Sequence, residues 1–259
     1  MKRKTKARIA LTLAAMLAAG AIGAAATMWT ITDRATNFDA NPQRTTQRHE
    51  ATQGATDNES ATTSESIDWD YWQSINPDII GWITVPNTGI DCPIVQASEI
   101  DPTYYLTHDV YGSWNYHGAP YLSCQCIQGG LLGSKNALVF GHHLLDGTMF
   151  SELANLISED SVIEHSPITL QTPQAKATLT VLAVDRINAN EETAALDFAD
   201  DAAFKEWLTT TAQNADLTLA TTKDLEQVTN VVTLCTCSYT TWNNERTLVI
   251  CSVNAKGAN

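Results

Sequence analysis

The stretch TLCTCSYTTWNNERTLVICSV, residues 233–253, decides how this chain folds near its C-terminus. It holds most of two β-type runs, Val231–Thr236 and Thr247–Val253, which are joined by a polar loop. If these runs pair as antiparallel strands, Arg246 at the start of the second run lies beside Cys237 at the end of the first. The sequence therefore predicts a strand pair that brings one thiol and one guanidinium together.

The spacing of the cysteines in this stretch separates one thiol from the others. Alternate side chains of a strand share a face, so Thr233, Cys235 and Cys237 point the same way. Cys251 lies five residues after Arg246, an odd number, and therefore faces the opposite side of its strand. We expect Cys237 to be a free thiol whose thiolate, the nucleophilic form, is stabilised by the neighbouring cation.

A cysteine nucleophile needs a proton carrier for its leaving group and a group that stabilises the oxyanion formed on attack. Arginine keeps its proton in proteins, so Arg246 suits the second task and a histidine suits the first. His142 and His143 directly follow the apolar run 137–140 and Gly141, where glycine lets the chain turn and present the next side chain. Periodicity alone does not choose between these two histidines.

The other four histidines fit the role of proton carrier less well. His49 lies in a polar segment far from the strand runs, and His117 and His165 lie in loop-like stretches where no strand run ends. His108 is followed by Asp109, and we interpret it as a structural histidine at a turn. His142 and His143 therefore remain the two candidates.

The N-terminal residues predict a membrane anchor. A basic tail, residues 1–8, precedes Ile9–Ile31, which are 23 residues without a charge. A helix of that length spans a hydrocarbon core, and the basic flank keeps the N-terminus in the cytoplasm. A cleaved signal peptide is the alternative, since GAIGAAATM offers small residues to a peptidase, but the apolar run continues beyond that site. We expect a single transmembrane signal-anchor at 9–31, with all later residues outside the cell.

A stalk and one domain follow the anchor. Residues 32–66 are polar and poor in large apolar side chains, so they cannot bury enough surface to offset their ordering entropy. We interpret them as a flexible stalk that carries a domain at 67–259. The formal net charge of the chain is −14 although its N-terminal flank is basic, so the domain is strongly acidic. This charge argues against nucleic acid as a partner, because phosphate binding needs clustered Lys and Arg.

The predicted domain is mainly β with helical insertions. Further β-type runs, broken by proline and glycine, lie at Gly81–Val85, Pro93–Gln96, Ala119–Leu122, Ala137–Phe140, Ile168–Gln171 and Thr178–Arg186. Helices are predicted at Asp68–Ile75, at 148–157 with Thr148 as the cap, and at Asp200–Asn214. About eight short strands with few helices indicate a closed eight-stranded β-barrel.

The six cysteines leave two other interpretations open. Outside the membrane an even number of cysteines suggests disulfides, and the candidates for pairing are Cys92, Cys124, Cys126 and Cys251. A disulfide-stapled binding module would place Cys237 in a bridge as well. A zinc site could combine the Cys-x-Cys pairs at 124–126 and 235–237 with the two neighbouring histidines. Structural zinc sites usually space their cysteines by two to four residues, so the gaps here disfavour metal.

Motifs spread over the whole of residues 67–259 resemble those of one protein family. TLCTC at 233–237, with Arg246 nine residues after its last cysteine, and NALVFGHH at 136–143 are similar to the motifs of sortases. Sortases are membrane-anchored cysteine transpeptidases of Gram-positive bacteria. INPDIIGWITVPNTGIDCPIVQ, YYLTHD, SKNALVFGHHLLDGTMFSEL and the helix FKEWL resemble class B sortases in particular.

The resemblance implies a mechanism and partners. His142, Cys237 and Arg246 match the family's catalytic residues, so the Cys237 thiolate would attack a peptide bond in the C-terminal sorting signal of a secreted protein. His142 would protonate the leaving amine, and an amine of a peptidoglycan precursor, or of a pilin lysine, would resolve the thioacyl-enzyme. Class B members need no metal or other cofactor. The loop at 187–229 is expected to contact the sorting motif. A cysteine peptidase that hydrolyses its substrate is the alternative enzyme.

One residue departs from the class B pattern, in which the middle residue of TLxTC is often serine. Here it is Cys235, which shares a face with Cys237 at about 7 Å along the strand. One hypothesis is that Cys235 resolves a sulfenic acid on Cys237 and makes the site redox-sensitive. The alternative is that Cys235 is a small substitute for serine.

Overall fold

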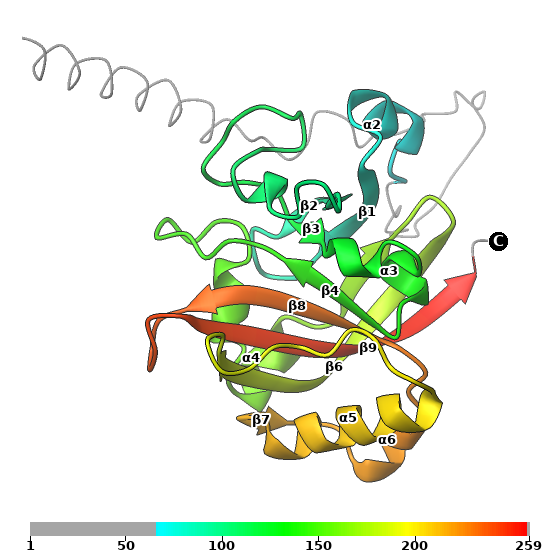
Figure 1. Ribbon diagram of the computed structural model, residues 1–259, viewed down its shortest axis with the longest axis vertical. Coiled ribbons are helices and arrows are strands. Elements are labelled where there is room, and N and C mark those ends of the chain that lie inside the picture. The colour runs from blue at the N-terminus through cyan, green and yellow to red at the C-terminus, as the bar shows by residue number, and fades with distance from the viewer. Residues whose placement is uncertain (1–65, 258–259) are drawn as a thin grey trace, which may run out of the picture. The chain divides into compact units, whose positions relative to one another are not determined.

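This computed structural model describes residues 66–257, which fold around a β-barrel (Figure 1). The strands are β1 Ile79–Thr84, β2 Asp91–Gln96, β3 Tyr121–Leu122, β4 Asn136–Phe140, β5 Ile168–Gln171, β6 Ala175–Asn188, β7 Leu217–Thr218, β8 Val231–Ser238 and β9 Glu245–Gly257. Their order is β5-β1-β2-β3-β4-β8-β9-β6-β7, and β5 also pairs with β6. That extra pairing closes eight strands into a ring, and β7 pairs with β6 beside it. The predicted closed eight-stranded barrel is confirmed.

Each predicted β-type run coincides with a strand, but the lengths differ. β6 and β9 extend beyond their predicted ends because they pair with each other from Ala175↔Gly257 to Asn188↔Glu245. The run predicted from Ala119 pairs only at Tyr121–Leu122, where β3 bridges β2 and β4. Cross-strand pairing, which the local sequence does not contain, sets these lengths.

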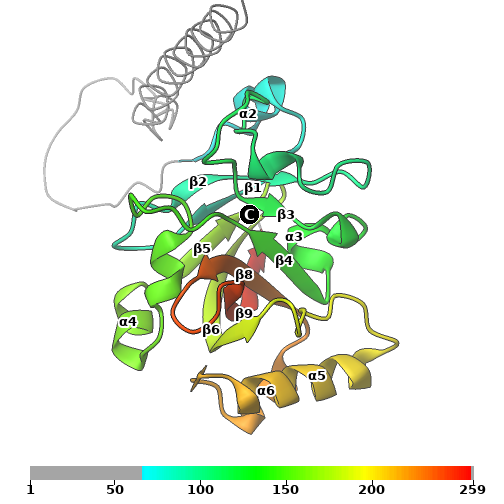
Figure 2. The ribbon, with the colours of Figure 1, turned by 60° about the vertical axis from the view of Figure 1, so that its left-hand side comes forward.

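The helices are insertions at the ends of the barrel. They are α2 Trp69–Ile75, α3 Gly130–Gly133, α4 Glu159–Glu164, α5 Asp201–Asn214 and α6 Thr222–Gln227, with short 3-10 turns η1 Tyr104–Leu106, η2 Cys124–Cys126 and η3 Ser151–Asn155. Asp68 caps α2 and Asp200 caps α5, at the two starts that the sequence predicts. α5 and α6 lie below β6, whereas α2 lies at the opposite end of the barrel (Figure 2).

The predicted helix at 148–157 is wrong. Met149 has a positive φ of 57°, and only the 3-10 turn η3 forms after it. The Ser151 hydroxyl accepts from the Leu144 N–H at 2.7 Å, and the Phe150 N–H donates to the His142 carbonyl at 3.0 Å. These bonds fold the segment back onto the end of β4, and the left-handed backbone at Met149 prevents a regular helix there.

Alternation along β8 and β9 separates two environments. Leu234 of β8 and Cys251 of β9 face the barrel core, where both are fully buried. Cys235 faces outward and packs with Leu248, under Leu196 from the segment that follows β6. The prediction that Cys251 faces away from Cys237 is therefore confirmed.

No helix within residues 66–257 is both long and apolar enough to cross a membrane. The predicted basic tail at 1–8, the anchor at 9–31 and nearly all of the stalk at 32–66 lie outside the described residues.

Candidate active site

The ends of β4 and β8 lie side by side because these strands pair in parallel. Phe140 is level with Cys235 in their register, and the Gly141 N–H donates to the Cys235 carbonyl at 3.0 Å. The ladder therefore continues past the end of β4. His142, two residues after Phe140, comes level with Cys237, and neighbouring strands lie about 4.8 Å apart.

The orientation of Gly141 selects between the two candidate histidines. A Cβ on Gly141 would lie 2.5 Å from the ring of Phe150, which is fully buried in the barrel core. Gly141 thus faces inward, and its neighbours in the extended chain, Phe140 and His142, face outward. His142 therefore shares the outward face with Cys237, which the periodicity of the sequence alone does not decide.

Arg246 lies directly opposite Cys237 in the antiparallel pair of β8 and β9. This confirms the pairing that the sequence predicts. Directly opposed side chains in such a pair have Cβ atoms about 4.5–5.5 Å apart. Cys237, Arg246 and His142 are all half-buried, so each retains access to solvent. The three predicted site residues thus occupy adjacent positions on one face, where β4, β8 and β9 end.

A backbone carbonyl orients the His142 ring. His142 Nε2 lies 2.7 Å from the carbonyl oxygen of Leu106, in the turn η1. A carbonyl oxygen only accepts hydrogen bonds, so Nε2 carries the proton and donates. This contact assigns the tautomer of the neutral ring, in which Nδ1 carries no hydrogen.

His143 contacts the backbone of Cys237. Its Nδ1 donates to the carbonyl of Cys237 at 2.8 Å, and its ring meets the ring of Tyr239 edge-on at 5.8 Å. Interaction with the Cys237 side chain, together with burial, raises the pKa of the neighbouring Tyr239. His143 and Tyr239 thus brace the end of β8 from two sides.

All six cysteines are free thiols, so the interpretation as a disulfide-stapled module does not hold. Cys92, Cys126, Cys235 and Cys251 are buried, whereas Cys124 and Cys237 are half-buried. Burial raises the pKa of Cys235 and of Cys251 to about 12, which keeps both protonated at neutral pH. Cys237 therefore combines solvent access with a neighbouring cation.

The Cys-x-Cys pairs do not build a metal centre in the part of the chain that the structure describes. Among residues 66–257 no group of three or more His, Cys, Asp or Glu side chains is arranged to hold a metal ion. Cys126 lies in the turn η2, where its Sγ donates to the carbonyl of Asn136 at 3.4 Å.

The other described histidines have structural partners. His108 stacks on Tyr104, as expected for a histidine at a turn. His117 is buried, and its Nε2 lies 3.2 Å from the Asp146 carboxylate. This contact joins two loops that flank His142. His165 contacts a backbone carbonyl at the end of α4.

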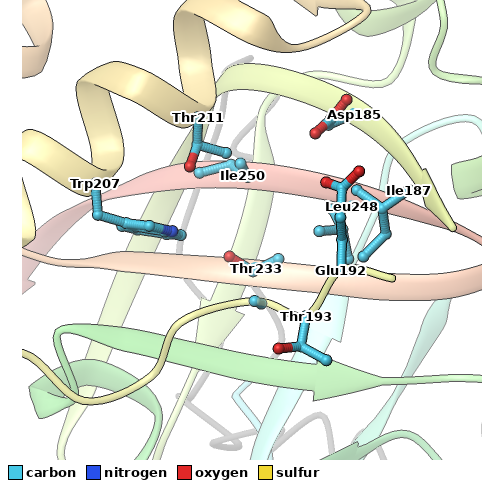
Figure 3. Close-up of a pocket in the computed structure, with 10 residues that line it drawn as sticks. Asp185, Ile187, Glu192, Thr193, Trp207, Thr211, Thr233, Leu248 and Ile250 are labelled. Carbon is cyan, nitrogen blue, oxygen red and sulfur yellow. The ribbon is translucent and has the colours of Figure 1, made fainter. Parts of the chain in front are cut away.

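A hollow continues along the outward face of β8 and β9, away from the thiol (Figure 3). Thr233, Leu248 and Ile250 form its floor, and Trp207 from α5 and Asp185 from β6 line its sides. The hollow begins beside Cys235, because Leu248 is opposite that residue in the register. It lies under the start of the segment 187–229, which the sequence predicts to contact substrate.

Two residues near the thiol were not predicted from the sequence. Tyr239 follows the TLCTC motif by two positions, and Glu245 directly precedes Arg246. Glu245 is the one acidic residue in the stretch 233–253, and its side chain is fully buried. An acidic residue next to the arginine was the available signal for Glu245. Nothing in the pattern separates Tyr239 from the polar residues of the loop.

Comparisons with known proteins agree with this geometry. Residues 83–254 match the Sortase domain family. The chain is 25% identical to sortase B of Listeria monocytogenes over 165 residues, which cover 64% of this chain and 65% of that protein's own length. Among solved structures, a Bacillus anthracis protein described as similar to sortase B superposes with a TM-score of 0.62 at 26% identity, covering 72% of this chain and 82% of that one. The Staphylococcus aureus sortase B–substrate complex has the same fold, with a TM-score of 0.62, 21% identity, and coverage of 71% and 83%.

Proposed function

The chain belongs to the sortase family, and from that premise we propose that it is a class B cysteine transpeptidase anchored in the cell membrane. Its substrates are secreted proteins with a C-terminal sorting signal, and its acceptor is an amine of a peptidoglycan precursor. One observation carries the proposal. Cys237 and Arg246 are directly opposed at the end of β8, and the backbone ladder brings His142 level with them on the same face.

In the first half-reaction the Cys237 thiolate attacks the carbonyl carbon of the scissile peptide bond. The guanidinium of Arg246 stabilises the oxyanion that forms, because it is a fixed positive donor beside the sulfur. As the C–N bond breaks, the His142 imidazolium gives its Nδ1 proton to the leaving amine and becomes neutral. The acyl group remains on Cys237 as a thioester.

In the second half-reaction an amine attacks the thioester carbonyl. His142, now neutral, accepts the proton that the attacking amine releases, and the Cys237 thiolate leaves. A new amide bond replaces the thioester, so the peptide bond is exchanged and no water is consumed. The Leu106 carbonyl supports both steps, because it holds the His142 ring in one tautomer.

The class B assignment draws on several features. The Listeria monocytogenes relative is a sortase B at 25% identity and the Bacillus anthracis structure is described as similar to sortase B at 26% identity. The segment between β6 and β8 contains the helix α5. The segment 187–229 crosses the outward face of β8, where Leu196 packs beside Cys235 and Leu248. We propose that this segment contacts the sorting motif. The anchor at 9–31 holds the catalytic domain outside the cell.

The test uses the full chain in mild detergent and a library of quenched peptides with sorting-type motifs. Cleavage is followed with and without an added amine, for the wild type, for Cys237→Ala, and for Cys124→Ala as a control that removes the other half-buried thiol. We expect cleavage that requires Cys237 and a product joined to the amine. Cleavage to the free acid alone, even with amine present, would favour a hydrolytic peptidase.

The acceptor is tested with two amines in separate reactions. One is a stem-peptide amine of the peptidoglycan type, and the other is a lysine within a folded protein. Preference for the stem-peptide amine supports cell-wall attachment. Preference for the protein lysine would favour a pilin-polymerising enzyme.

A further inference from the structure

The loop between β8 and β9 is folded around a single buried carboxylate. It begins two residues after Cys237 and returns to the sheet at Glu245, whose side chain is 0% exposed. Glu245 stands directly before Arg246 in the chain. In the register of β8 and β9, Glu245 is opposite Ser238, so it stands next to the Cys237–Arg246 pair along both strands.

Three consecutive loop residues donate to this carboxylate. The Thr240 N–H and hydroxyl donate to Oε1 at 3.2 and 2.7 Å. The Thr241 and Trp242 N–H groups donate to Oε2 at 2.8 and 3.3 Å. Burial raises the pKa of Glu245, but hydrogen bonds such as these outweigh it and lower the pKa to about 2. The carboxylate is thus ionised at neutral pH, and the loop conformation depends on its charge.

The Glu245 carboxylate and residues 240–242, which we call the clamp, are also hydrogen-bonded to β6. Arg186 Nη1, from β6, donates to the Thr240 hydroxyl oxygen at 3.3 Å, and Arg186 Nε is held by Asp216 at 2.8 Å. The Thr240 hydroxyl itself donates a hydrogen bond to Glu245. The loop is therefore connected to β6 as well as to the end of β9.

Both sides of the clamp reach the thiol. On the loop side, Tyr239 meets the His143 ring edge-on, and His143 in turn holds the Cys237 carbonyl. On the strand side, Arg246 Nη1 donates to the carbonyl oxygen of Glu245 at 3.0 Å. A substitution at Glu245 therefore affects Cys237 through Tyr239 and His143. It affects the guanidinium of Arg246 through the backbone.

We propose that Glu245 is a positioning residue of the active site: its buried carboxylate gathers residues 240–242 and thereby holds Tyr239 and Arg246 beside Cys237. Tyr239 lies two residues after Cys237 and meets the His143 ring, and we include its hydroxyl in the proposal as a donor to the reacting sulfur, which would make Tyr239 a further catalytic residue. This inference rests on the proposed function, in which Cys237 is the nucleophile.

Glutamine at position 245 tests the role of the carboxylate without a change in side-chain volume. Glutamine has the shape of glutamate but only one acceptor oxygen, and its second terminal atom is an NH2 donor. Four donors point at Glu245, so in either orientation the amide places N–H against N–H. Glu245→Gln should therefore open the loop although it preserves volume. Glu245→Asp keeps the charge on a shorter side chain and should restore part of the function.

The experiment compares the full chain in detergent as wild type, Glu245→Gln, Glu245→Asp and Tyr239→Phe, with Glu164→Gln as the matched control. Glu164 is an exposed carboxylate at the end of α4. Iodoacetamide labelling is followed by mass spectrometry of the Cys237 peptide, and the Cys124 peptide in the same sample is the internal reference. Peptide turnover and thermal unfolding are measured on the same preparations.

We expect Glu245→Gln to slow labelling of Cys237 relative to Cys124 at pH 7 and to move its pH profile to higher pH, because the thiolate loses partners. Turnover should fall about 10- to 100-fold, since small displacements of catalytic groups have effects of that size. Glu245→Asp should recover part of both losses, and Tyr239→Phe should reproduce the slower labelling. Glu164→Gln should match the wild type.

The proposal is overturned if Glu245→Gln labels and turns over like the wild type, or if it only lowers the unfolding temperature while labelling of Cys237 is unchanged. If Glu245→Gln does not fold, Tyr239→Phe decides, and wild-type labelling in that variant overturns the proposal. A wild-type chain that cleaves no peptide would count against the proposed function, whereas the labelling ratio would still decide the role of Glu245.

Discussion

The outward face of β8 has a covered part and an open end. In the covered part Cys235 is 4% exposed and packs beside Leu248, under the segment that follows β6. At the open end Cys237 is half-buried and lies opposite Arg246. The two cysteines are the same residue type, two positions apart on the same face. Their difference in exposure therefore comes from where the strand ends and what covers it.

The reactivity of each thiol follows from its position on β8. Burial raises the pKa of Cys235 to about 12, so this thiol stays protonated under physiological conditions. Cys237 instead lies opposite the guanidinium of Arg246, and His143, whose ring meets that of Tyr239 edge-on, holds its carbonyl. The predictions below change one end of the face at a time.

The largest expected effect at the open end comes from the paired histidines. His142→Ala should lower kcat about 10²- to 10⁴-fold, because the leaving amine loses its proton donor. His143→Ala should have a smaller effect, since its ring holds only the Cys237 carbonyl and the Tyr239 ring. Steady-state turnover of the best library peptide, measured for both variants, checks this order. A larger loss in His143→Ala would reverse our assignment of the proton carrier.

Arg246→Lys removes the planar fork and keeps the positive charge at the open end. Turnover should fall about 10²-fold, because a flexible ammonium does not hold the oxyanion in the same place. The measurement is kcat and KM for both chains. Loss confined to KM would show that Arg246 binds the substrate without stabilising the oxyanion.

Cys235→Ser tests the covered part. The serine hydroxyl would lie among Leu138, Ile187 and Leu248, so we expect a loss of about 1–3 kcal/mol in the free energy of unfolding and little change in turnover. Sensitivity to peroxide should be unchanged, since a protonated and buried thiol resolves a sulfenic acid slowly. Urea unfolding and peroxide inactivation check the two parts. Reduced recovery after peroxide in Cys235→Ser would instead support the redox hypothesis.

The smallest expected effect is on the pH dependence of stability. Glutamate has a pKa of about 4.3 when unfolded, and in the fold the pKa of Glu245 is about 2. A lowered pKa stabilises the native state above about pH 4.3, and this contribution is lost as the pH falls through about 2. Urea unfolding from pH 7 to pH 2 should show a decline of about 1–3 kcal/mol from this residue. The Glu245→Gln chain should show a flatter profile, and identical profiles would contradict the clamp.

Sequence reasoning succeeded where the determining contacts repeat along the chain. The period of two along β8 and β9 predicted that Cys237 meets Arg246 and that Cys251 faces away. The short β-type runs likewise predicted a closed barrel, although cross-strand pairing set the lengths of β6 and β9.

Sequence reasoning failed where distant segments decide the outcome. Periodicity left His142 and His143 open, and only the family resemblance chose His142, because the local pattern does not contain the parallel pairing between β4 and β8. The expected helix at 148–157 did not form because Met149 has a positive φ and the segment folds back onto the end of β4, where the Phe150 N–H donates to the His142 carbonyl. Glu245 was missed because most of its donors are backbone N–H groups of a loop, and a one-letter sequence does not mark them.

The most direct test of the central claim is to trap the acyl group on the enzyme. The full chain is mixed with a sorting-type peptide that it cleaves, without added amine, and is quenched in acid within the first turnover. Mass spectrometry of the digest then locates the added acyl mass. We predict it on the Cys237 peptide alone, with release on addition of amine and none in Cys237→Ala. An acyl group on Cys124 or Cys235, or cleavage in Cys237→Ala at the wild-type rate, would contradict the account.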